Sequence, residues 1–71
     1  MRFRVGQTRE VLRVEAPTAE EAAQWAGRWW GHAPDTCYMV YRVRPEADLF
    51  ADPDPEDPER GLYQASGARW A

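Results

Sequence analysis

The stretch "PTAEEAAQWAGRWWG", residues 17–31, carries the signals of one helix with both ends marked. Thr18 is suited to be the N-cap, and Glu21, three residues later, completes the pattern of a capping box. Gly31 stands where a helix ends in the left-handed conformation that favours glycine. We therefore predict a helix over 18–30. A buried stripe at the spacing i, i+3, i+4, i+7 is expected to consist of Ala22, Trp25, Ala26 and Trp29.

The segments on either side of this helix have the patterns of β-strands. "RFRV" (2–5) and "LRVEA" (12–16) alternate polar and apolar residues around a glycine turn, which predicts a hairpin. "CYMVYRVR" (37–44) is rich in aromatic and β-branched residues, as strands are. Residues 61–71 have apolar runs on either side of a Ser-Gly turn and predict a second hairpin. The order β-β-α-β-β-β predicts an α+β fold, an antiparallel sheet with one helix packed on one face.

Strand alternation assigns the side chains of this sheet to two faces. The face toward the helix is expected to hold Phe3, Val5, Leu12, Val14, Ala16, Met39, Tyr41 and Val43. The open face is expected to hold Val11, Glu15 and Val40 together with the residues of a possible nucleic-acid surface, namely Arg2, Arg4, Arg13, Tyr38, Arg42 and Arg44. Arginine interleaved with an aromatic residue suits nucleic acid, because bases stack on rings and guanidinium groups contact phosphates. An ordinary solvated face and a surface for self-association are the other two interpretations.

The charge of the chain is uneven along its length. The 71 residues allow one domain, 1–71, and carry nine Arg, no Lys and a net charge of −3. Residues 46–59 contain seven acids and no base. We interpret them as an acidic, proline-rich loop within the single domain, held at both ends by strands.

The most acidic part, "DPDPEDPE" (52–59), has three interpretations. It is a solvated loop that keeps the protein soluble, an internal partner that neutralises arginines, or a binding element that imitates a nucleic-acid backbone. The third is favoured by the prolines, because a pre-extended chain loses less entropy on docking. The acids that would then contact a basic surface of a protein partner are Asp52, Asp54, Glu56, Asp57 and Glu59.

Four tryptophans are too many to bury fully in so small a protein. Trp30 directly follows Trp29 and must point about 100° away from it on the helix, and Trp70 is next to the last residue. An exposed tryptophan is a typical anchor of protein interfaces, whereas core packing is the alternative for Trp30. The predicted partner-binding surface therefore adds Trp30 and Trp70 to the five acids.

No pattern in the chain predicts catalysis, a metal site or a cofactor. Cys37 and His32 are five residues apart, but a cysteine packed in a strand is usually inert. A structural zinc site needs four Cys/His ligands, and the chain has one of each. A single cysteine also makes an internal disulfide impossible and favours a reducing compartment. With no signal-peptide pattern and no long apolar run, we expect a cytoplasmic protein that does not span a membrane.

"LRVEAPTAEEAAQWA" (12–26), a strand running into a capped, alanine-rich helix, resembles a strand-helix unit common in small phage and mobile-element proteins. Together with "YMVYRV" and "LYQASGARW", the arrangement resembles the type I-F anti-CRISPR proteins that have a β-sheet and a single helix. The acidic segment 46–59 departs from that pattern, and no site residue is carried over. The resemblance implies a phage-derived protein that binds a host nucleoprotein complex and inhibits it.

We therefore expect a non-enzymatic binding protein that inhibits a host protein or nucleoprotein complex. The alternatives are a nucleic-acid-binding sheet and a structural subunit that self-associates, for example as a homodimer.

Overall fold

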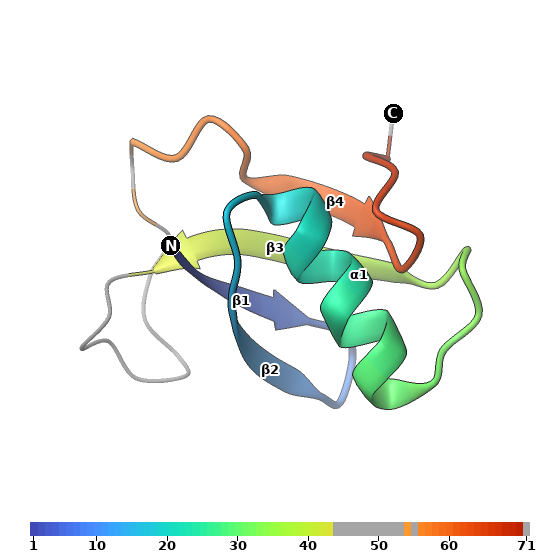
Figure 1. Ribbon diagram of the computed structural model, residues 1–71. Helices are drawn as coiled ribbons and strands as arrows, with labels where there is room; N and C mark the ends of the chain where they lie inside the picture. Colours follow the sequence, from blue (N-terminus) through green and yellow to red (C-terminus); the bar gives the residue numbers. More distant parts are fainter. Residues whose placement is uncertain (44–53, 55, 71) are drawn as a thin grey trace.

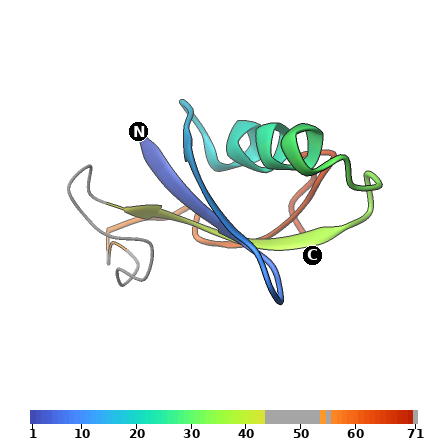
Figure 2. The same ribbon diagram turned by 90° about the horizontal axis from the view of Figure 1, so that it is seen from below.

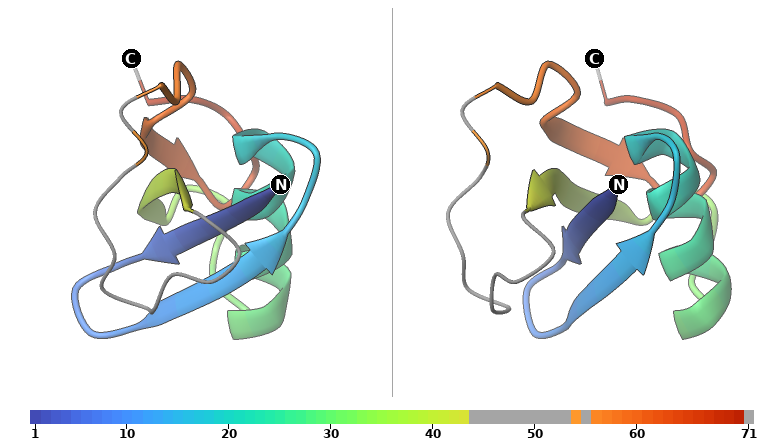
Figure 3. Two further views of the ribbon diagram at one scale, coloured as in Figure 1. Left: turned by 90° about the vertical axis from the view of Figure 1, so that its left-hand side faces the viewer. Right: turned by 60° about the vertical axis from the view of Figure 1, so that its left-hand side comes forward.

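The computed structural model describes residues 1–43, 54 and 56–70. Over these residues the chain forms a four-stranded antiparallel sheet with one helix, in the order β-β-α-β-β, which confirms the predicted α+β class (Figure 1). The elements are β1 (Arg2–Gly6), β2 (Val11–Glu15), α1 (Ala19–Trp30), β3 (Cys37–Val43) and β4 (Gly61–Gln64). The strands are ordered β2-β1-β3-β4, so β2 and β4 form the two edges of the sheet (Figure 3).

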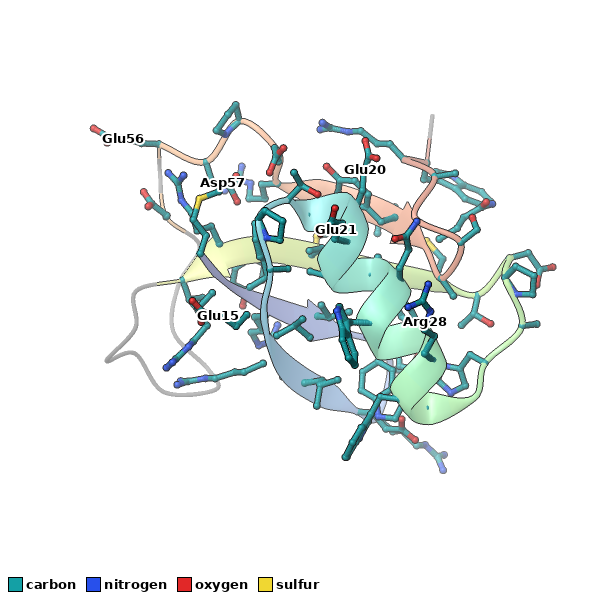
Figure 4. All side chains as sticks on the ribbon, in the orientation of Figure 1. Glu15, Glu20, Glu21, Arg28, Glu56 and Asp57 are labelled. Atoms are coloured by element: carbon teal, nitrogen blue, oxygen red, sulfur yellow. The ribbon has the colours of Figure 1, made fainter. Side chains whose placement is uncertain are left out.

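The helix begins and ends where its sequence predicts. The Thr18 hydroxyl accepts a hydrogen bond from the Glu21 amide at 3.3 Å, as an N-cap does. Gly31 is left-handed, with φ of 70°, and its amide donates to the Gly27 carbonyl. The acidic first turn and Arg28 in the last turn suit the helix dipole (Figure 4).

α1 covers one face of the sheet (Figure 2) and packs on it through small residues rather than tryptophans. Ala22 and Ala26 are buried as predicted, but Trp25 and Trp29 are 56% and 72% exposed, so the predicted stripe is wrong for both indoles. Close approach of the helix explains the difference. A Cβ atom on Gly27 would lie only 2.7 Å from the Ala65 Cβ, so this contact has no room for a larger side chain. The buried face consists of Ala19, Ala22, Ala23, Ala26 and Gly27.

The two faces of β3 are reversed relative to the prediction. Tyr38 and Val40 lie in the core at 1% and 0% exposure, and Met39 is exposed on the open face. Both alternating sets of β3 contain large apolar residues, Tyr38 and Val40 in one and Met39, Tyr41 and Val43 in the other, so alternation alone could not choose between them. The register decides it, since Val40 pairs with the core residue Val5. The inward positions predicted for β1 and β2 are confirmed: Phe3, Val5, Val14 and Ala16 are buried, and Leu12 packs against them.

The predicted C-terminal hairpin is reduced to β4 and a tight reversal. Beyond β4, one isolated bridge joins Tyr63 to Arg69, and no further strand forms over 65–70. The Ala65 amide donates to the Thr36 carbonyl at 2.8 Å, which continues the pairing of β4 with β3 by one position. The chain then reverses and returns beside β4, where the Gln64 amide donates to the Ala68 carbonyl and the Trp70 amide to the Leu62 carbonyl, both at 2.8 Å.

α1 has twelve residues, and no helix in the described part of the chain is long and apolar enough to cross a membrane.

Candidate functional site

The described part of the acidic segment folds back onto the end of β3 and surrounds Arg42. The Asp57 carboxylate accepts from the Arg42 backbone amide at 2.7 Å. The Asp54 carboxylate accepts from Arg42 Nε and pairs with Nη2, both at 3.3 Å. Arg42 Nη2 also donates to the Glu56 carbonyl at 3.3 Å. The amide and the guanidinium group of Arg42 are therefore bound within the chain, in agreement with the interpretation that the acidic segment neutralises an arginine.

The same carboxylates shape the segment itself. Asp54 accepts from the Glu56 amide and Asp57 from the Glu59 amide, each at 2.9 Å, as aspartates do in tight turns. Glu59 reaches the start of the helix, where its carboxylate accepts from the Ala19 amide at 3.3 Å. The interpretation of this segment as an extended, solvated loop is therefore wrong for Asp54, Asp57 and Glu59, which are half-buried.

Two other members of the predicted acidic surface differ from this pattern. Glu56 is exposed and points away from the molecule, whereas Asp57 is turned toward the end of β3 (Figure 4). Within the described residues no contact of the Glu56 carboxylate is seen. Asp52 lies outside the described residues.

Only part of the predicted nucleic-acid surface comes together. Arg2, Arg4 and Arg13 share the open face, where Arg4 lies directly opposite Arg13 on one side and Tyr41 on the other. The Arg4 guanidinium carbon is 5.3 Å from the centre of the Tyr41 ring, and Tyr41 is only 8% exposed. Its ring is thus covered and unable to stack on a base.

The remaining members of that surface lie elsewhere. Tyr38 and Arg42 are on the helix side of β3, for the reason of register given above, and Arg44 lies outside the described residues.

Trp30, His32 and Tyr38 form an aromatic cluster below the C-terminal end of α1. The Trp30 ring centre is 5.4 Å from each of the other two rings, and Tyr38 Oη is hydrogen-bonded to His32 Nδ1 at 2.7 Å. Burial raises the pKa of Tyr38, and the charge of Glu10 adds to the effect. Trp30 is half-buried and packs against the core.

His32 and Cys37, the pair considered in the sequence, are not joined in the described part of the chain. His32 is engaged by Tyr38 and, at 3.4 Å, by Gln7, and these residues show no hydrogen bond between His32 and Cys37. Nor do the described residues contain a group of three or more His, Cys, Asp or Glu side chains placed to hold a metal ion.

The most exposed aromatic surface lies along β2, where the sequence prediction did not place it. Trp25 and Trp29, one helical turn apart, project beside this edge strand. Together with β2 they border a shallow groove of about 380 Å³. We call this surface the tryptophan edge; it is lined by Leu12, Arg13, Val14, Glu15, Trp25 and Trp29.

A second stripe in the helix sequence could have revealed this surface. Ala19, Ala22, Ala23 and Ala26 follow helical spacing as well as the chosen stripe does, and choosing them as the core leaves Trp25 and Trp29 outside. Trp70, the other predicted anchor, is 52% exposed but belongs to the opposite edge, since its amide donates to the Leu62 carbonyl of β4 at 2.8 Å.

Comparison of the chain with protein-family models, with curated proteins and with solved structures gave no match. The resemblance to type I-F anti-CRISPR proteins stays a prediction.

Proposed function

We propose that this protein is a non-enzymatic protein-binding domain and that its contact surface is the tryptophan edge. The observation that carries the proposal is the exposure of Trp25 and Trp29, 56% and 72%, beside an edge strand. Exposed indoles in contact with water forgo the stabilisation that their burial would give. Tryptophan is also the residue most enriched at the energetic centres of protein interfaces.

The edge strand supports the same function through its backbone. Within the described sheet, β2 pairs with β1 on one side only. The other side presents amide and carbonyl groups that can pair with a further strand, a common mode of protein recognition. An apolar groove next to these groups gives the added strand a surface for its side chains.

The inhibition of a host protein or nucleoprotein complex by a phage-derived protein remains our proposal for the biological role. Its contact surface moves from the acidic segment to the tryptophan edge, since three carboxylates of that segment make internal contacts. Glu56 is the described acid that stays available to a basic partner.

Affinity capture from the native host tests the proposal. The tagged wild type is compared with a Trp25→Ala, Trp29→Ala variant and with Trp70→Ala, which removes a similarly exposed indole from the other edge. We expect the double variant to lose the captured protein and Trp70→Ala to retain it, while circular dichroism shows both folded. Equal capture by the double variant would refute the assignment of the tryptophan edge.

A nucleic-acid-binding sheet is the second candidate, favoured by the placement of Arg2, Arg4 and Arg13 on one face. Such binding should weaken steeply as salt rises, because it releases counterions from phosphates. A labelled oligonucleotide titrated at low salt, with Arg4→Ala, Arg13→Ala as the variant, checks this. Absence of binding by the wild type at low salt would eliminate the candidate.

A further inference from the structure

We propose that the partner at the tryptophan edge is a second copy of this chain, joined by antiparallel pairing of β2 with β2 about a two-fold axis at Val14. The inference rests on the protein-binding function proposed above and takes a second copy, in place of a host protein, as the partner at this surface. Three features of the described residues lead to it: the backbone groups of the edge, the charges on the open face, and the indoles on the helix side.

The first feature is the set of backbone groups that β2 leaves unpaired. At the two ends of the β1–β2 ladder the Gln7 amide donates to the Glu10 carbonyl and the Ala16 amide to the Met1 carbonyl, both at 2.9 Å. Hydrogen-bonded pairs alternate along an antiparallel ladder. The even-numbered residues of β2 therefore bond to β1, and amides and carbonyls face outward at Val11, Arg13 and Glu15.

The second feature is charge, which selects one register for the symmetric pair. Opposite residues must share a face, so the two-fold axis passes through a residue of β2. An axis at Leu12, Arg13 or Val14 pairs at least three strand residues of each copy, whereas one at either end of β2 pairs a single residue. Centred on Arg13, the pairing sets two like charges directly opposite one another, which is destabilising. Centred on Leu12, it leaves Glu15 beyond the end of the partner strand. Centred on Val14, it places Arg13 of each copy opposite Glu15 of the other and forms four backbone hydrogen bonds at these two pairs.

The hydrogen bonding of the Arg13 side chain is an independent reason to expect a carboxylate at this edge. Its Nε and Nη2 atoms are buried and have no hydrogen-bond partner, and the cross-strand neighbour Arg4 carries the same charge. An unsatisfied buried donor is costly, more so when it is charged. Because the chain itself covers these two atoms, the Arg13 side chain must turn outward along the edge before Glu15 of a second copy can supply the acceptor. The Glu15 side chain is 70% exposed; its carboxylate contacts Arg2 Nε at 3.4 Å and the terminal amine of Met1 at 3.7 Å, and its remaining lone pairs can accept from a further donor.

The third feature is the helix side of the same edge. In the Val14 register, Val14 meets its own copy and Leu12 lies opposite Ala16, with Trp25 and Trp29 of both copies flanking this apolar centre. With aromatic side chains burying ~150–250 Å² each, the exposed 56% and 72% of the two indoles amount to roughly 250 Å² per copy. That is about a third of the ~800 Å² per partner of a standard interface. The paired strands and the rest of the groove supply the remainder.

Two charge-reversed variants, measured alone and as a mixture, test the pairing. In sedimentation equilibrium we expect the wild type to dimerise, and Arg13→Glu and Glu15→Arg, each alone, to dimerise at least about tenfold more weakly. An equimolar mixture of the two variants places opposite charges at both pairs and should restore the dimer. Variants that both dimerise as the wild type does, or a folded mixture that stays monomeric, would overturn the proposal.

A cysteine pair reports the register directly. Opposed residues of a non-hydrogen-bonded antiparallel pair have Cα atoms about 4.5 Å apart, within the range of a disulfide. In a Cys37→Ser background, Val14→Cys should cross-link on mild oxidation, whereas Leu12→Cys, four positions from its own copy, should not. Cross-linking through Leu12→Cys instead would overturn the Val14 register. Should Val14→Cys fail to fold, the charge-reversal mixture decides.

The oligomeric state of the wild type, measured together with host-protein capture, distinguishes a failure of this inference from a failure of the proposed binding function. A chain that stays monomeric at all concentrations, yet captures a host protein through Trp25 and Trp29, would overturn the second copy as partner and leave the binding function standing. A monomer that captures nothing would overturn both.

Discussion

Replacing Asp57 by Ala should destabilise the fold, whereas replacing Glu56, one residue earlier, should not. Both changes remove one negative charge from the same segment, so they form a matched pair. The Asp57 carboxylate accepts from two backbone amides, that of Arg42 at 2.7 Å and that of Glu59 at 2.9 Å. The Glu56 side chain is exposed and points to solvent (Figure 4).

The magnitude follows from the two lost hydrogen bonds. A hydrogen bond to a charged group contributes ~1.5–3 kcal/mol, and Asp57 is half-buried, so water replaces part of it. We expect Asp57→Ala to lower the free energy of unfolding by about 2–4 kcal/mol. For a domain of this size 1 kcal/mol shifts Tm by ~4–8 °C, so the midpoint should fall by roughly 10–25 °C. Asp57→Asn keeps one acceptor oxygen and should lie between Asp57→Ala and the wild type.

Thermal and urea unfolding followed by tryptophan fluorescence measure these differences, with Glu56→Ala as the control. We expect Glu56→Ala to stay within about 0.5 kcal/mol of the wild type, as surface substitutions do. Equal stability of Asp57→Ala and Glu56→Ala would refute the argument that the acidic segment is a structural part of the fold.

Three further changes test the packing, the cap and the buried phenols. Gly27→Ala should destabilise despite its ~1 kcal/mol gain in helix propensity, because the new Cβ would lie 2.7 Å from the Ala65 Cβ; a stabilised variant in urea unfolding would show that the helix can shift. Thr18→Ala should cost about 1 kcal/mol by removing the acceptor of the Glu21 amide, and Thr18→Ser should retain most of it. Burial raises the pKa of Tyr63 above its ordinary value of 10.0, more than the nearby Arg69 lowers it. The stabilisation from this phenol is thus complete below pH 10 and is lost as the pH rises through its folded-state pKa, because the unfolded chain ionises first. Tyr63→Phe should therefore show a shallower loss of Tm above pH 10, and an unchanged slope would assign the loss to other groups.

Local signals were sufficient for the elements of this fold. The ends of α1 depend on Thr18 and Gly31, which act through contacts within one turn of the helix. The strands follow from alternation and β-propensity over four to seven residues, and their antiparallel order follows from short connections. Each of these features is encoded by neighbours in the chain.

The candidate site depends on contacts between residues that are far apart in the chain. Alanines and tryptophans both form helical stripes in α1, and the close contact of Gly27 with Ala65, 38 positions later, decides that the alanines face the sheet. Pairing of Val40 with Val5 decides which face of β3 is buried. The tryptophan edge follows from the first of these contacts, and the placement of the Tyr41 ring on the open face follows from the second.

The acidic segment illustrates the same division. Its composition and prolines predicted a charged, non-helical connection, which local repulsion and missing amide donors explain. The Asp57 carboxylate accepts from the Arg42 amide, and the Glu59 carboxylate accepts from the Ala19 amide. Both contacts depend on the packing of the strands and the helix, which the sequence of the segment does not contain. The sequence by itself determined the helix and the four strands, because caps and periodicity act over a few residues. Register and packing, which act between distant residues, decided which side chains are left to meet a partner.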